Sequence, residues 1–182
     1  MIAFKGFNKD LVCTKGNGKF KYEVGKTYKE DKCNVASNGF HCVEEPIRVL
    51  DWYEDRFCIV EITGDINEKD NKITATEMTI LKEIDLIQLA TCECVWIQNH
   101  PDREMSPRIM KDTGTSQNDF VIVRGKDPMA AGKKGATLFL LKEAKNSKKI
   151  EKITAIYIDG DDIKENQYYN IKQEVVKRVR KR

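Results

Sequence analysis

The segment spanning residues 5–53 most limits what this chain can fold into. It alternates apolar, glycine and cysteine positions and is broken by polar turns such as Lys15-Gly16-Asn17-Gly18. Glycine and asparagine favour the tight turns that join neighbouring strands, so the pattern predicts short strands in a meander or in hairpins. Similar patterns follow further along, and we expect strands over residues 1–7, 20–24, 57–62, 72–80, 120–124, 136–142, 152–158, 168–172 and 174–179.

Two segments depart from this strand pattern. Pro46 precedes Ile47, Leu50 and Tyr53, which follow one another at helical spacing, and proline suits the first turn of a helix. We therefore expect a short helix over residues 46–53. Residues 83–98 have a helical period and stop just before Pro101, which predicts the main helix. The predicted fold class is α+β, with strand-rich antiparallel sheets, one main helix and one short helix.

The polar segment 101–119 divides the chain. It contains two prolines and little periodicity, so we expect a linker or exposed loop between an N-terminal α+β module (1–100) and a small antiparallel β module (120–182). The two sides also differ in charge. Residues 1–100 hold 13 basic and 17 acidic residues, a net charge of −4, whereas residues 101–182 hold 19 and 12, a net charge of +7. Such asymmetry predicts that the modules face different partners or each other.

The compartment is expected to be the cytoplasm, here of a bacterial host. No apolar run approaches the roughly 18 to 20 residues that span a bilayer, and the N-terminus lacks the basic head and apolar middle of a signal peptide. No membrane partner is expected. Cysteines in that setting are reduced, so we expect free thiols at all six cysteines, which are Cys13, Cys33, Cys42, Cys58, Cys92 and Cys94.

Four residues of the N-terminal segment are of the types that bind zinc in proteins. Cys13, Cys33, His41 and Cys42 would suit tetrahedral zinc. No C-x-x-C pair occurs, however, and neighbouring residues on a strand point to opposite sides. Buried reduced thiols are the favoured interpretation, so no metal or other cofactor is expected, and zinc is the alternative.

Common catalytic motifs are absent from the sequence. It contains no P-loop, no G-x-G-x-x-G after a strand, no H-E-x-x-H and no G-x-S-x-G, which favours a binding protein over an enzyme. One enzymatic alternative comes from a resemblance. The placing of KGF, NGFH and VE is similar to the layout of ADP-ribosyltransferase-like folds. The resemblance implies that Lys5, His41 and Glu61 would surround a dinucleotide, with Lys5 where those folds have Arg or His.

Basic and aromatic residues mark the candidate binding surfaces. A basic tail contacts nucleic acid through phosphates, although a solvated chain end is the simpler interpretation. Tryptophan and tyrosine after the short helix could anchor a partner, although core packing is their commoner role. The candidate nucleic-acid or partner-binding residues are Lys133, Lys134, Lys177, Arg178, Arg180, Lys181, Arg182, Trp52 and Tyr53.

Two segments carry a further resemblance. The strings KGFNKDLVC, YEVGKTY and GFHC, followed by the Pro46-led helix, resemble an uncharacterised domain common in phage and prophage proteins. The strings GKKGATLFLLKE and KITAIYIDGDDIKENQYYNIK resemble the closing segment of the same proteins. Many of those relatives carry a Gly/Ala-rich repeat between the two ends, and the interval 101–129 here lacks one.

The chain also resembles anti-CRISPR proteins of type II-A. That resemblance implies a stoichiometric inhibitor that binds a type II CRISPR effector nuclease, with or without guide RNA, and blocks DNA targeting or cleavage. A net charge of +3 does not suit a whole-molecule DNA mimic, which must be strongly acidic to occupy the effector's basic channel. We therefore expect docking through a defined patch, with DNA as a second partner. A nucleic-acid-binding phage accessory protein is the other alternative.

Overall fold

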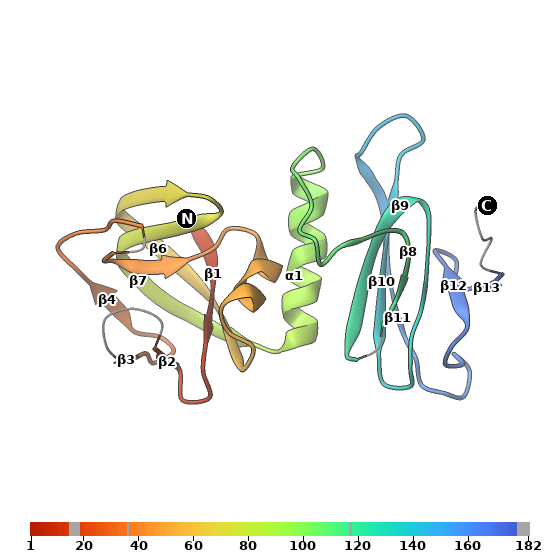
Figure 1. The fold of residues 1–182 in the computed structure, drawn as a ribbon, viewed down its shortest axis with the longest axis horizontal. Coiled ribbons are helices and arrows are strands. Elements are labelled where there is room, and N and C mark those ends of the chain that lie inside the picture. The colour runs from red at the N-terminus through yellow and green to blue at the C-terminus, as the bar shows by residue number, and fades with distance from the viewer. Residues whose placement is uncertain (15–18, 36, 117, 178–182) are drawn as a thin grey trace. The chain divides into compact units, whose positions relative to one another are not determined.

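The computed structural model describes residues 1–14, 19–35, 37–116 and 118–177. The chain forms two compact units, Met1–Leu89 and Ala90–Arg182 (Figure 1). Antiparallel sheets dominate, and there is one main helix, which confirms the predicted strand-rich α+β class. No helix within the described residues is long and apolar enough to cross a bilayer.

The first unit is built on one antiparallel sheet. Its order is β1-β6-β7-β4, and β5 pairs with β7 beside β4. The strands are β1 (Ile2–Phe7), β4 (Thr27–Lys29), β5 (Phe40–Cys42), β6 (Arg56–Lys69) and β7 (Lys72–Ile84). A separate two-stranded sheet joins β2 (Val12–Cys13) to β3 (Phe20–Lys21).

The long hairpin of β6 and β7 extends past its predicted strands, 57–62 and 72–80. Asp70 and Asn71 form its two-residue loop, with φ of 51° and 63°. Positive φ at both positions is the mark of a type I′ turn, which matches the twist of paired strands. The exposed stretch before the turn contains Gly64, with φ of 73°, at a break in the strand register. Polar residues and this bulge gave no alternating apolar signal, so the extension of β6 was missed.

The register between β1 and β6 shows which of their residues lie on the buried face of the first sheet. Ala3 opposes Val60 and Lys5 opposes Cys58, and directly opposed residues share a face. Fully buried neighbours on the sheet include Phe7 and Ile62, and Lys5 is buried among them at 6% exposure. A charged side chain therefore lies on the apolar face of the sheet.

Both helices begin at residues that suit a first helical turn. A 3-10 helix, η1 (Pro46–Asp51), occupies the predicted short helix, with Pro46 at its start. The main helix, α1 (Leu86–Asn99), begins three residues after the predicted residue 83, because β7 stays paired with β6 through Ile84. The Asp85 carboxylate accepts the Gln88 N–H (2.7 Å), and the Gln88 side chain accepts the Asp85 N–H (3.0 Å). This reciprocal pair is a capping box.

The second unit contains a six-stranded sheet in the order β11-β10-β9-β12-β13, with β8 paired to β9. Its core includes Val123, Leu138, Leu140 and Ile156. Contrary to the wholly antiparallel module expected for 120–182, β9 runs parallel to both β8 and β10. The strands are β8 (Met110–Thr115), β9 (Phe120–Ala131), β10 (Thr137–Glu143), β11 (Ile150–Tyr157), β12 (Tyr168–Asn170) and β13 (Val175–Val176).

Part of the expected linker, 101–119, is a strand of this sheet. β8 is mostly polar and exposed, so it lacks the alternation that marks a half-buried strand. Gly114 explains how it pairs closely with β9. A Cβ at this position would lie 2.6 Å from Cγ2 of Val123, which is closer than side-chain carbons approach. The glycine that suggested a loop is required by close strand packing.

The capping box predicts a measurable contribution to stability. Asp85→Ala should lower the free energy of unfolding by about 1 kcal/mol, because the Gln88 N–H loses its acceptor. Urea unfolding measures the change. Gln98→Ala, at an exposed position near the other end of α1, is the matched control and should stay within about 0.5 kcal/mol. Equal stabilities of Asp85→Ala and the unaltered protein would contradict the assignment.

Candidate ligand-binding cleft

A cleft of about 660 Å³ lies in the first unit. Its walls come from β1, β5, η1 and the start of β7, together with residues around β3. Cavities of 300–1,000 Å³ are the usual size for small-molecule sites. The cleft is therefore large enough for a ligand, and its chemistry depends on a few charged and aromatic side chains.

Lys5 is the buried charge of this cleft. Its ammonium donates a hydrogen bond to the backbone carbonyl of His41 (Nζ–O 2.6 Å). It also lies 5.2 Å from the ring centroid of Tyr22 and 5.7 Å from that of Phe7. Among the described residues, no carboxylate forms an ion pair with it. An ammonium has three donors, so Lys5 keeps donor capacity for a group that enters the cleft.

His41 lies beside this ammonium on β5. Its Nδ1 is 3.1 Å from the carbonyl oxygen of Gly39. Burial, and then the positive charge of Lys5, lower the pKa of His41 below its ordinary value. Imidazole protonation is thus disfavoured in the cleft near neutral pH. Since β1, with Lys5, also pairs with the residue after β5 through the Phe4–Val43 bridge, the two side chains keep a fixed relation.

Gly39 shapes the turn before His41. Its φ is 86°, and a Cβ there would lie 2.5 Å from Oγ1 of Thr74. Only glycine fits such a position without strain. The Gly39 N–H donates to the Glu30 carboxylate (2.8 Å), so the acidic residue of the cleft is held by the turn. The geometry of the cleft wall therefore requires the glycine of the GFHC string.

Aromatic rings cover much of the remaining wall. Phe20 and Trp52 are 42% and 40% exposed, whereas Tyr22 is buried, with its ring centroid 4.7 Å from that of Phe20. The Lys72 ammonium lies 4.2 Å from the ring centroid of Trp52. The Tyr53 hydroxyl accepts a hydrogen bond from the Thr14 N–H (3.0 Å). Exposed rings beside cations can hold a planar or anionic group.

The predicted ADP-ribosyltransferase-like trio is only partly brought together. Lys5 and His41 both line the cleft. Glu61 is exposed on β6, opposite Ile2, and lies three residues from Cys58, the partner of Lys5. Because side chains alternate along a strand, Glu61 and Lys5 point to opposite faces of the sheet. These three residues do not assemble into one site.

The predicted zinc ligands are likewise separated. Cys13 and Cys42 line the cleft, whereas the Cys33 thiol donates to the Asp65 carbonyl (3.2 Å). Over the described ranges, no three His, Cys, Asp or Glu side chains are grouped closely enough to hold a metal ion. Burial raises the pKa of the Cys42 thiol to about 12, and all six cysteines are free thiols.

The remaining candidate residues lie in different places. Trp52 and Tyr53 line the cleft. Lys133 and Lys134 are exposed between β9 and β10 of the second unit, and the Lys134 N–H donates to the Glu165 carboxylate (3.4 Å). Lys177 is exposed after β13. The other four tail residues lie outside the described part of the chain, and they are Arg178, Arg180, Lys181 and Arg182.

Sequence reasoning did not single out several residues of the cleft wall, among them Lys19, Phe20 and Lys72. None of them lies in a recognisable motif. Lys72 reaches the cleft because β7 pairs with β5, and Phe20 because β3 pairs with β2. The pairing of β7 with β5 joins residues far apart in the chain, so no local pattern indicated Lys72. Phe20 lies in a local pairing, and the strand predicted over 20–24 did not indicate that its side chain would line a cleft.

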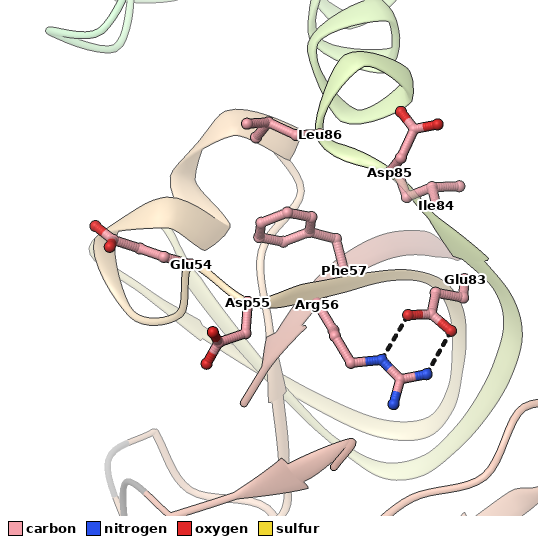
Figure 2. Close-up of a pocket in the computed structure, with 8 residues that line it drawn as sticks. All are labelled: Glu54, Asp55, Arg56, Phe57, Glu83, Ile84, Asp85 and Leu86. Atoms are coloured by element: carbon pink, nitrogen blue, oxygen red, sulfur yellow. Dashed lines mark hydrogen bonds and ion pairs between the residues drawn. The ribbon is translucent and has the colours of Figure 1, made fainter. Parts of the chain in front are cut away.

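A second cavity of about 520 Å³ lies between the starts of β6 and α1 (Figure 2). Figure 2 shows Arg56 and Glu83 facing each other in a bidentate ion pair. Nε and Nη2 of Arg56 each lie 2.6 Å from a carboxylate oxygen of Glu83. The remaining nitrogen, Nη1, donates to the Lys9 carbonyl (3.0 Å). Every guanidinium nitrogen of Arg56 therefore donates a hydrogen bond within the protein. The Arg56–Glu83 pair links β6 to β7, and we call it the brace. The larger cleft is the better candidate site.

The brace should respond to pH in a defined direction. The hydrogen-bonded Arg56 guanidinium lowers the pKa of Glu83 below its ordinary value. Stability from this pair is therefore present above the unfolded-state pKa of about 4.3 and is lost as pH falls through the lower folded-state pKa. At pH 7, Glu83→Gln should lower the free energy of unfolding by about 0.5–1 kcal/mol, since the pair is partly exposed.

Denaturant unfolding between pH 7 and pH 2.5 checks this prediction. The difference between Glu83→Gln and the unaltered protein should shrink below about pH 4. Glu61→Gln is the matched control and should show no such pH dependence, because Glu61 is on the same strand as Arg56 and forms no ion pair with any residue of the described ranges. A difference that persists undiminished at pH 2.5 would show that the pair is not electrostatic.

Comparison with known proteins gives a family but no activity. A family model described as a domain of unknown function, DUF7666, matches residues 1–91. No curated protein and no solved structure matches the chain. The matched residues contain every side chain that lines the cleft. With half of its length covered, the chain belongs to the DUF7666 family.

Proposed function

We propose that this protein acts by binding, and that the cleft of its first unit takes an anionic ligand. One observation carries the proposal: the Lys5 ammonium is buried on the apolar face of the sheet without a carboxylate partner among the described residues. Removing an ammonium from water costs several kcal/mol unless an opposite charge compensates for it. An anion bound in the cleft would supply that charge.

The contacts that Lys5 already makes offset only part of this cost. A cation near an aromatic ring gains about 0.5–2 kcal/mol, and a neutral carbonyl acceptor adds a comparable amount. Lys19 and Lys72 also line the cleft, so the nearby lysines add repulsion in place of compensation. A protein that keeps a positive charge here without a ligand loses stability, which is typical of binding sites.

Thermal unfolding in pyrophosphate at constant ionic strength tests the proposal. The melting temperature of the unaltered protein should rise with pyrophosphate, because a ligand that binds only the folded state stabilises it. Lys5→Met keeps the apolar stem and removes the charge. It should melt at the same or a higher temperature without pyrophosphate, and it should lose the pyrophosphate-dependent rise.

Lys82→Met is the matched control. Lys82 is exposed on β7 of the same sheet and does not line the cleft. The control changes the net charge by the same amount and should retain the full rise. An unaltered protein that shows no rise, or a Lys5→Met variant that retains it, would overturn the proposal.

Inhibition of a type II CRISPR effector nuclease is the second function that we propose, with kinship to phage and prophage proteins as part of it. Its setting would be the bacterial host cytoplasm. The observation that favours it is Trp52, a large aromatic side chain with 40% exposure at the end of η1. Tryptophan is enriched among the residues that dominate protein interfaces. The partner would be the effector with or without guide RNA, and bound DNA would be a second contact.

Capture of the purified effector, with and without guide RNA, tests this second function. The immobilised protein should retain the effector, and Trp52→Ala should weaken retention at least tenfold, as expected for an interface anchor. Leu81→Ala removes an apolar side chain of similar exposure from β7 and should leave retention unchanged. Failure to capture the effector in either state would remove the hypothesis without affecting the anion site.

A further inference from the structure

The cleft carries more positive charge than one carboxylate ligand would balance. Among the residues that the structure describes, Lys5, Lys19 and Lys72 line it, against a single carboxylate from Glu30. The Glu30 carboxylate is committed to the Gly39 N–H at 2.8 Å. Three cations against one anion leave two positive charges, which match a diphosphate better than a singly charged group.

Strand pairing brings two of these cations to either side of β5. The Lys5 ammonium contacts the carbonyl of His41. On the other side, Cys42 opposes Ile73 of β7, and Lys72 precedes Ile73. The positive charges of both Lys5 and Lys72 act on His41 and help to keep its pKa low. Both lysines line the same cleft, so their ammonium groups can contact neighbouring phosphoryl groups of one ligand.

An aromatic platform lies in the same cleft. Phe20 is 42% exposed at the wall, and Lys19, one of the three cations, precedes it. Its ring is braced by edge-to-face contacts with Tyr28 and Phe40, at centroid distances of 5.4 and 6.1 Å. A ring held in this way loses little freedom when a planar group stacks on it. Nucleobases stack on aromatic side chains with little dependence on base identity.

We propose that the cleft binds a nucleoside diphosphate, with the diphosphate between Lys5 and Lys72 and the base on Phe20. This inference rests on the proposed anion-binding function and names the ligand class. A fatty acid is the main competing class, because it too joins an apolar body to an anion. It brings one charge to a cleft with three cations, and it has no planar group to stack on the ring of Phe20, so the observations favour the nucleotide.

Isothermal titration calorimetry with ADP, pyrophosphate, adenosine and decanoate tests the inference. ADP should bind more tightly than each of the other three. Phe20→Leu should weaken ADP binding roughly tenfold and leave pyrophosphate binding unchanged, because stacking is lost and the charges remain. Phe20→Tyr keeps the ring and should retain ADP binding. Lys72→Met should weaken ADP and pyrophosphate alike. The melting temperature of each variant confirms that it is folded.

The outcomes separate the two proposals. Equal affinity for ADP and pyrophosphate, tighter binding of decanoate, or unaltered ADP binding by Phe20→Leu would overturn the nucleotide and leave the anion site standing. Absence of binding by all three anions would overturn both.

Discussion

The antiparallel register between β1 and β6 turns Lys5 toward the apolar face of the first sheet. Ala3 and Phe7, two residues away on either side, are fully buried on that face. An ammonium in this position must find compensation within its own surroundings. Its contacts are one carbonyl and two aromatic rings. These contacts offset only part of the free-energy cost of burying a charge.

Neighbouring segments fix the position of the carbonyl that accepts the Lys5 hydrogen bond. Gly39 adopts a positive φ, so that β5 can enter the sheet beside Thr74, and Glu30 secures the turn through the Gly39 N–H. The carbonyl of His41 then accepts from Lys5. A substitution at Gly39 would therefore disturb the hydrogen-bond acceptor of Lys5, although the glycine itself has no side chain. Motif residues that contact no ligand can be as necessary to a site as those that do.

Local chemistry made much of the fold predictable. Pro46 and the boundary at Pro101 marked the two helices. Apolar and β-branched residues marked β1 and the first parts of β6 and β7. Strand β8 was missed because its residues are polar and its close pairing depends on a glycine. The parallel pairings of β9 were missed because strand direction is set by contacts distant in sequence.

The site was predictable only in part, for the same reason. Lys5, His41, Trp52 and Tyr53 stood out as chemically distinctive residues in the N-terminal segment, and all of them line the cleft. Glu61 was assigned to the same site from its position in the sequence, but strand alternation directs it to the opposite face. Lys72 enters the cleft through pairing with β5, which no local pattern reveals.

An anionic ligand bound in the cleft should neutralise the charge of the Lys5 ammonium. Nuclear magnetic resonance of the lysine side-chain ammonium groups, in protein labelled with ¹⁵N-lysine, observes that charge directly, because a buried ammonium exchanges its protons slowly enough to be seen. The Lys5 signal, assigned by its loss in Lys5→Met, should shift as pyrophosphate is added and should reach a plateau. A Lys5 signal that does not move while pyrophosphate saturates the protein would contradict the account.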